Sequence, residues 1–221
     1  MRRYLLFACL GSLLATNAVH AQSAKRHTYF KLNPTTLINE LDLYLEQELS
    51  PSTSLEIGAG GIYTDYWDRL LNQFDFGQIK PNLSTRQYLQ AKGVAGRIGF
   101  RYYIIAPDFD NLRARGTYFE PLLLFKQVWY PTDHKTIDEE KYPENGNKRI
   151  WGLQLLVGRQ HRNGRWIIDK YFGLGVKAKT YSFDNYKTNS ATGKVQNDND
   201  HTTSWLPSIQ LGIKIGLAGK Q

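Results

Sequence analysis

The sequence has little of three features that would place it in common classes of protein. Its only cysteine is Cys9, so we expect no internal disulfide once the first residues are cleaved off. Beyond those residues no run of about 18 apolar residues occurs, which excludes a membrane-spanning helix. Basic residues are scattered, with no Lys/Arg run longer than two, so we expect no nucleic-acid partner.

The first 21 residues have the features of a secretory signal. Arg2 and Arg3 precede an apolar stretch over 4–14, and a small-x-small cleavage site ends at Ala21. Cleavage there lowers the formal charge from +8 to +6 over the remaining 200 residues. A lipid anchor at Cys9 is the alternative, disfavoured because the apolar run continues past it. We therefore predict a signal peptide at 1–21 and a single domain at 22–221.

The rest of the chain alternates between apolar and polar residues with period two, which is typical of β-strands with one apolar face. Eight strands are predicted, at 28–33, 39–49, 54–63, 88–105, 117–130, 149–160, 166–181 and 205–217. Asn163-Gly164 predicts a type I′ hairpin turn. The connections at 64–87, 131–148 and 182–204 are long and alternate with short ones, as in outer-membrane barrels. The predicted fold is therefore all-β: an eight-stranded antiparallel up-and-down transmembrane β-barrel with a periplasmic C-terminus.

The two faces of the predicted strands differ in a way that assigns their direction. The apolar face carries bulky side chains such as Phe172 and Leu211, whereas the other face mixes small residues with charges of both signs. Eight strands leave a lumen just wide enough for side chains, so we expect the apolar face outward and the charges paired inside. The alternative is a soluble, lipocalin-like binding barrel with its apolar face inward. The predicted lumen charge network is Glu40, Asp42, Glu56, Arg97, Arg101, Glu120, Lys126, Asp169, Lys177 and Lys214.

Aromatic residues mark the predicted strand ends and one predicted loop. Four of the five tryptophans lie on the apolar face at strand ends, where an aromatic girdle meets lipid head groups. This girdle is Trp129, Trp151, Trp166 and Trp205. Within the loop 64–87, the aromatic residues Tyr66, Trp67, Phe74 and Phe76 are candidates for packing over the barrel mouth or for binding a partner.

Chemistry-bearing residues are few. His201 stands beside Thr202, Thr203 and Ser204 near the predicted outer rim, which leaves a lipid-modifying enzyme as an alternative function. The acidic stretches around Asp138-Glu139-Glu140 and Asp198 lack EF-hand or zinc spacing. We therefore expect no catalytic, metal or cofactor site.

Several short segments carry a resemblance to a known family. Among them are Leu41-x-Leu43-x-Leu45-Glu46, Gly99-Phe100-Arg101-Tyr102-Tyr103 and Tyr171-Phe172-Gly173-Leu174-Gly175-Val176. These resemble small bacteroidete-type outer-membrane β-barrels known as a domain of unknown function, similar in build to OmpX-like and OmpA-like barrels. The resemblance covers nearly the whole chain after the signal, but the sequence ends Gly219-Lys220-Gln221, without the terminal aromatic that is common in such barrels.

The resemblance implies a monomeric barrel in the bacterial outer membrane, and the family has no known active site to transfer. We expect a structural or adhesive protein, or an accessory subunit, acting through its external loops. Its expected partners are outer-membrane lipid and a larger outer-membrane protein complex.

Overall fold

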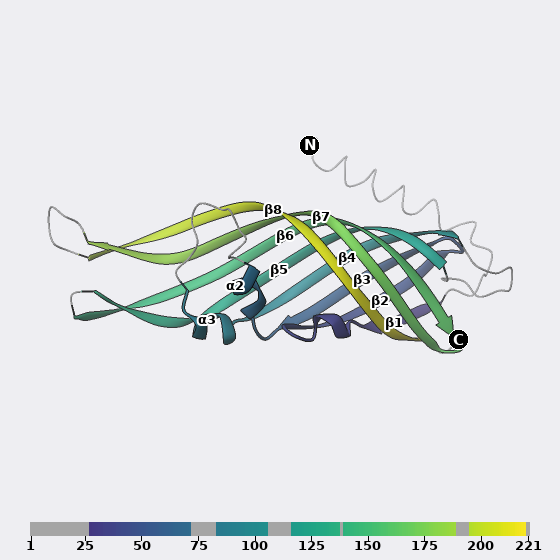
Figure 1. The fold of residues 1–221 in the computed structure, drawn as a ribbon, viewed down its shortest axis with the longest axis horizontal. Helices are drawn as coiled ribbons and strands as arrows, with labels where there is room; N and C mark the ends of the chain where they lie inside the picture. Colours follow the sequence, from purple (N-terminus) through teal and green to yellow (C-terminus); the bar gives the residue numbers. More distant parts are fainter. Residues whose placement is uncertain (1–26, 72–82, 106–115, 138, 189–194, 220–221) are drawn as a thin grey trace, which may run out of the picture.

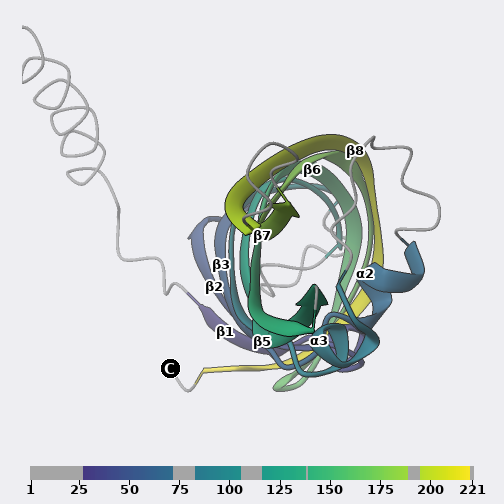
Figure 2. The ribbon, with the colours of Figure 1, turned by 90° about the vertical axis from the view of Figure 1, so that its left-hand side faces the viewer.

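The chain forms eight antiparallel strands in one closed sheet. The computed structural model describes residues 27–71, 83–105, 116–137, 139–188 and 195–219. The strands are β1 (Thr28–Leu32), β2 (Glu40–Ser50), β3 (Thr53–Ile62), β4 (Lys92–Ile105), β5 (Gly116–Ile137), β6 (Glu140–Asn163), β7 (Trp166–Thr188) and β8 (Val195–Ala218). Each strand pairs with its neighbours in the sequence, and β1 pairs with β8 to close the ring (Figures 1 and 2). The predicted eight-stranded up-and-down barrel is confirmed.

The short first strand completes the barrel. β1 pairs with β2 over its whole length and with β8 from Tyr29↔Ala218 to Leu32↔Ile215. The Gly219 N–H donates to the Thr28 carbonyl (2.8 Å), so the start of β1 and the end of β8 lie at the same end of the barrel. A 3-10 turn, η1 (Pro34–Thr36), follows β1 at the opposite end, as the parity of strands predicts.

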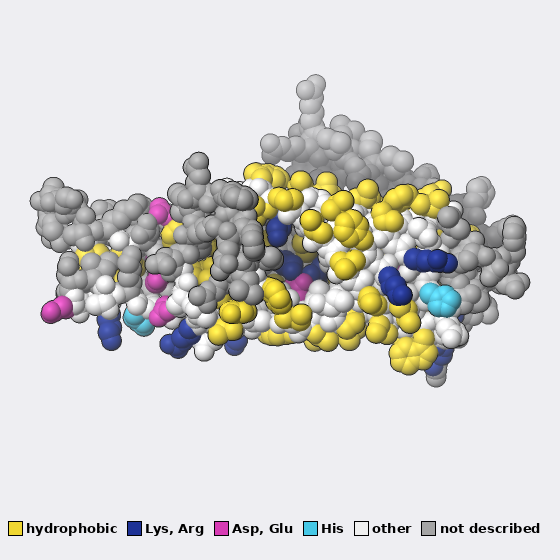
Figure 3. Space-filling view, in the orientation of Figure 1, with side chains coloured by type: hydrophobic (Ala, Val, Ile, Leu, Met, Phe, Trp, Pro, Cys, Tyr) yellow, Lys and Arg dark blue, Asp and Glu magenta, His cyan; other side chains and the backbone are white. Residues whose placement is uncertain are grey.

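The apolar face of the strands points outward. Leu211 is 77% exposed and Phe172 44%, whereas Arg101 and Asp169 inside the ring have no exposed surface. The lipocalin-like arrangement, with the apolar face inside, is therefore wrong. Apolar side chains cover much of the wall in the space-filling view (Figure 3).

The predicted loops at 131–148 and 182–204 are wrong, because β5 to β8 continue through most of them as paired strands. His134 lies opposite Pro143, and Ser182 lies opposite His201. We name residues 130–137, 139–147, 181–188 and 195–204 the extension; it projects beyond β1 to β4 at one end of the molecule (Figure 1). Beyond a few aromatic residues at its base, the extension is mostly polar, so it lacks the apolar periodicity by which strands are detected in a sequence.

The predicted loop 64–87 contains the short helix α2 (Tyr66–Leu71) and the start of a second one, α3 (Thr85–Leu89). The predicted strand 88–105 is therefore wrong at its start, because α3 occupies 88–89 and β4 begins at Lys92. Ser84 caps α3, accepting from the Gln87 N–H while the Gln87 side chain accepts from the Ser84 N–H, which is a capping box. Tyr88 packs edge-on against Tyr130, with ring centroids 5.5 Å apart, in an apolar cluster at the barrel mouth. The helices therefore lie at one side of the barrel mouth, as Figure 2 shows, and we call α2 and α3 together the cap.

The hairpin between β6 and β7 lies where Asn163-Gly164 predicts it, but its turn is not type I′. Asn163 pairs with Trp166, so the central residues are Gly164 and Arg165. Of these only Gly164 has positive φ, at 60°. A glycine with positive φ at the first central position is the pattern of a type II′ turn, which also suits the twist of a hairpin.

Candidate functional site

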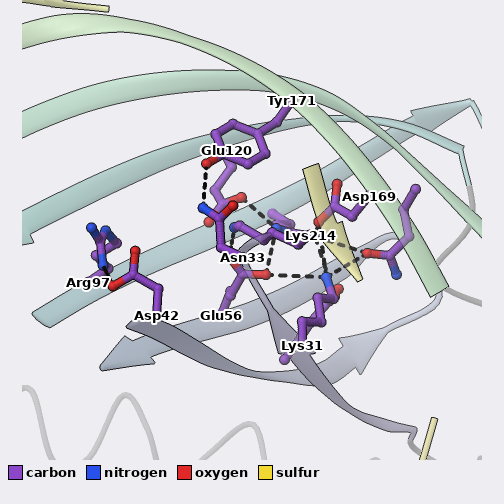
Figure 4. Close-up of polar contacts among 12 residues, drawn as sticks. Lys31, Asn33, Asp42, Glu56, Arg97, Glu120, Asp169, Tyr171 and Lys214 are labelled. Carbon is purple, nitrogen blue, oxygen red and sulfur yellow. Dashed lines mark hydrogen bonds and ion pairs between the residues drawn. The ribbon is translucent and has the colours of Figure 1, made fainter. Parts of the chain in front are cut away.

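A cluster of ion pairs fills the lumen near the end where β1 begins and β8 ends. Arg101 of β4 is its centre. Its guanidinium lies closest to carboxylates of three strands, Glu56 (2.5 Å), Glu120 (2.8 Å) and Asp169 (2.7 Å), and it reaches Glu46 of β2 at 3.4 Å. Lys214 of β8 pairs with Glu56 from the opposite side. Figure 4 shows Glu56, Glu120, Asp169 and Lys214 converging from separate strands. With Arg101, the cluster links β3, β4, β5, β7 and β8.

Two further residues complete this cluster: Glu46, which the sequence places on the polar face of the predicted strand 39–49, and Lys31, which it does not place in the lumen. Lys31 of β1 pairs with Glu46 and approaches Glu56 (3.2 Å) and Asp169 (3.1 Å). Lys31 was missed because β1 is too short to show clear alternation. The completed cluster places four carboxylates against three cations, and all seven side chains are at most 2% exposed.

A second cluster lies farther along the lumen toward the cap. Arg97 contacts Asp42 (2.5 Å) and Glu40 (2.6 Å), and Lys126 contacts Glu40 (2.6 Å). Tyr44 lies between the two clusters: the Lys214 ammonium is 4.1 Å from its ring centroid, which is a cation–π contact. Nine of the ten predicted network residues therefore make lumen ion pairs.

The tenth predicted residue, Lys177, differs from the others. It is partly buried and forms no ion pair or hydrogen bond with another residue in the described ranges. It lines a cavity of 230 Å³ between the second cluster and the cap.

The cap is held to the barrel by a third ionic group, which the sequence did not predict. Asp68 of α2 contacts Lys148 of β6 (3.0 Å) and Lys179 of β7 (2.7 Å), and it accepts from the Tyr181 hydroxyl (2.6 Å). Asp65 pairs with Lys148 and accepts from the Tyr130 hydroxyl (2.6 Å). A polar loop sequence gave no sign that these aspartates would enter the lumen.

The two aspartates of the cap have opposite pKa shifts. Burial alone would raise the pKa of Asp68, but the Lys148 and Lys179 ammonium groups outweigh burial and hold the pKa well below its ordinary value. Burial raises the pKa of Asp65 above its ordinary value, because the single ammonium of Lys148 does not fully offset it and Asp68 adds like charge. Asp68 is therefore the firmer anchor of the cap.

The four girdle tryptophans point outward, with exposures between 51% and 75%. Trp151 and Trp205 lie at one level on either side of Ala178, whereas Trp166 lies near the opposite end, opposite Leu217. Only Trp166 stands at a strand end. The prediction that the other three do so is wrong, because their strands continue into the extension.

The candidate loop aromatics divide into two pairs. Tyr66 and Trp67 belong to α2 and are 37% and 44% exposed, and Trp67 also lines the 230 Å³ cavity. Phe74 and Phe76 lie outside the described residues.

His201, the residue of the enzymatic alternative, contacts a serine that the sequence did not indicate. The Ser182 Oγ lies 2.8 Å from His201 Nδ1, across the β7–β8 pair. Both line a 760 Å³ groove on the outer face of the extension, beside Trp151 and Arg149. Thr202, Thr203 and Ser204 follow on the same strand.

Within the described ranges, no group of three or more His, Cys, Asp or Glu residues is arranged to hold a metal ion. Asp138, part of one acidic stretch, lies outside these ranges. Among the helices of the described residues, none has the length and apolar character needed to cross a membrane. No family model, curated protein or solved structure matches the chain.

Proposed function

We propose that the protein is a small outer-membrane β-barrel of structural, adhesive or accessory type. The observation that carries the proposal is the inverted arrangement of its side chains, with ion pairs enclosed and Leu, Ile, Phe and Trp covering the outside. Soluble monomers rarely expose continuous apolar patches larger than a few hundred Å². A wall of this kind, flanked by tryptophans, suits acyl chains and head groups. The signal at residues 1–21 and the resemblance to bacteroidete-type barrels support export to the outer membrane.

In this proposal side chains plug the lumen. Paired side chains fill it at two levels, and Asp68 holds α2 at the mouth. Small eight-stranded barrels have interiors that side chains can fill completely. The barrel therefore anchors and positions an external element instead of conducting ions.

The external element is the extension. It consists of two strand pairs, β5–β6 and β7–β8, which pair with each other only at its base, and it has no counterpart among the described residues of β1 to β4. Most of its side chains are polar. The short β2–β3 and β6–β7 turns lie at the end where β1 begins and β8 ends. This assigns that end to the periplasm and the extension to the cell surface. We infer that the extension binds a partner protein of an outer-membrane complex, or an external surface.

A pull-down from mild-detergent extracts of outer membranes tests this proposal. The full-length protein is expected to co-purify with a defined partner. A variant in which Asn-Gly replaces residues 135–142 is expected to lose it. Recovery of the same set of proteins with both variants would contradict a role for the extension tip, and recovery of the tagged protein in the aqueous fraction would contradict the membrane placement.

A second function is favoured by one observation, the Ser182–His201 contact. A serine hydrogen-bonded to a histidine beside a groove is the minimal nucleophile–base pair of acyl-transfer enzymes. The groove lies directly above the girdle residue Trp151, at the level of lipid head groups in the proposed orientation. If the pair modifies lipid, His201→Ala and Ser182→Ala will each abolish a change in lipid A that mass spectrometry detects; unchanged lipid A in both variants excludes it. The single exposed Ser182–His201 contact supports the enzymatic function less strongly than the whole apolar wall supports the first function, which is therefore preferred.

A further inference from the structure

The barrel wall is incomplete along one seam. β1 pairs with β8 only as far as Ile215, while β8 continues for twenty residues toward the extension with β7 as its one strand partner in the described ranges. η1 closes the part of this seam nearest to Ile215, where the β1–β8 pairing ends. A methyl group at Gly212 would lie 2.7 Å from Thr35 Oγ1, so turn and strand touch there. Pro207 lies in the unpaired part, where the edge of a sheet tolerates proline.

On the side of this contact nearer the extension, the 230 Å³ cavity connects the lumen to the outside of the wall. Its charged lining comprises four cations, Arg97, Lys126, Lys148 and Lys177, and three carboxylates, Glu40, Asp65 and Asp68. Thr36 of η1 also lines it, as does Ile209, whose side chain is 71% exposed on the apolar face. Figure 3 shows charged side chains in a hollow within the apolar wall. The lumen is therefore open through the barrel wall, at a level between Trp151 and Trp205 on one side and the Arg101 cluster on the other.

Two polar groups inside this opening lack partners among the described residues. Lys177 has no ion pair or hydrogen bond to any other residue in these ranges. Gln154 is 4% exposed; its amide donates to Ser208 Oγ (2.6 Å), but its Oε1 accepts from nothing in the same ranges. Gln154 pairs with Gly175 and Gly152 with Lys177, so Gln154 and Lys177 are diagonal neighbours on the lumen side of β6 and β7. A buried acceptor without a partner costs free energy that a hydroxyl donor would recover.

We propose that this seam is a lateral portal that binds the head group of an anionic, hydroxyl-bearing lipid, of the phosphatidylglycerol class, from within the membrane. The phosphate contacts Lys177 and a glycerol hydroxyl donates to Gln154 Oε1. The cavity is smaller than the roughly 300–1,000 Å³ of pockets that enclose drug-sized ligands. It holds a head group only, and the acyl chains stay outside along Ile209 and Leu211, the latter 77% exposed. This inference rests on the membrane placement proposed above.

Native mass spectrometry of the detergent-purified full chain tests the portal. The protein is titrated separately with phosphatidylglycerol, phosphatidic acid, phosphatidylcholine and soluble glycerol phosphate. The expected order is phosphatidylglycerol tightest, at least tenfold above phosphatidylcholine, with phosphatidic acid between them and no retained glycerol phosphate. Tight binding of glycerol phosphate alone would overturn the lipid origin of the ligand.

Three variants separate the contributions. Lys177→Gln is expected to weaken phosphatidylglycerol binding at least fivefold without loss of folding, because Lys177 has no partner among the described residues to lose. Gln154→Leu is expected to remove the advantage of phosphatidylglycerol over phosphatidic acid and to keep that of phosphatidic acid over phosphatidylcholine. Lys141→Gln, at an exposed lysine of the extension, is the control and is expected to bind like the wild type.

Equal phosphatidylglycerol binding by Lys177→Gln and wild type would overturn the portal. A wild-type protein that retains bound lipid of all classes without head-group preference would overturn it as well, while leaving the membrane placement standing. A protein that binds no lipid and needs no detergent would instead contradict the proposed function.

Discussion

At the scale of single residues, the stability of the filled lumen depends on buried charges, each of which needs its ion-pair partner. Arg101 contacts four strands besides its own through carboxylates, and its guanidinium lies 4.3 Å from the centroid of the Tyr118 ring. Taking ions out of water is costly, and only close pairing offsets that cost. Removal of one partner therefore leaves an uncompensated buried charge.

Arg101→Met is expected to lower the free energy of unfolding by about 3–5 kcal/mol, because several buried carboxylates lose their shared cation. Urea titration of the folded protein in lipid vesicles, followed by tryptophan fluorescence, measures the change. Arg159→Met is the matched control, since Arg159 is exposed on the outer face of β6. Equal stability of the Arg101 and Arg159 variants would show that the ionic cluster does not hold the barrel together.

The sequence predicted single residues well where alternation was clear. Ile209, Leu211 and Phe172 face outward and Arg97 and Arg101 inward, because a period of two leaves one choice of face once the bulky side is assigned. Lys31 was overlooked because five residues of β1 carry too little pattern. Asp65 and Asp68 could not have been found, since their position follows from the fold of a polar segment over the mouth.

At the scale of elements, the cap and the extension decide what the barrel presents outside. The sequence marked the region of each but predicted loops for both. Strand residues that face water on both sides have no apolar period, and a six-residue helix is too short to show a helical one. Pairing partners from the barrel below, not local preference, make these segments regular.

The cap is expected to stay docked at mildly acidic pH. The folded-state pKa of Asp68 is depressed below the value of about 3.9 of an unfolded aspartate, so its contribution is complete above that value and is lost as pH falls through the folded pKa. Acrylamide quenching of Trp67, in a variant that keeps it as the only tryptophan, is expected to be the same at pH 7 and pH 5. Asp68→Asn is expected to increase quenching at both pH values, and a rise in the parent between pH 7 and 5 would contradict this anchor.

The tip of the extension is expected to be dispensable for folding. The Asn-Gly replacement of residues 135–142 keeps the Ser84–Asp133 contact (2.7 Å) and the bond from Gln87 Nε2 to the Pro131 carbonyl (3.1 Å), which dock α3. Its urea midpoint in vesicles is therefore expected to match that of the parent. A large loss of stability would mean that the tip supports the barrel and does not serve only for binding.

At the scale of the whole molecule, a plugged lumen has a direct electrical consequence. Ion-paired side chains occupy the path along the barrel axis, so the purified protein is expected to give no steady channel in planar-bilayer recording. An open conductance of porin size, persistent over minutes, would contradict the plug. Asp68→Asn, which loosens only the cap, is expected to remain closed because both ionic clusters lie below it.

The central claim is that the apolar wall contacts acyl chains, and spin labelling along β8 tests it most directly. Single cysteines at positions 207 to 213, in a Cys9→Ser background, are labelled with nitroxide in protein reconstituted into vesicles. The expected result is collision with oxygen that rises and falls with period two, with maxima at Ile209, Leu211 and Ile213 and minima at Ser208, Gln210 and Gly212. Maxima at the second set, or no alternation with all positions open to a water-soluble nickel chelate, would contradict the account.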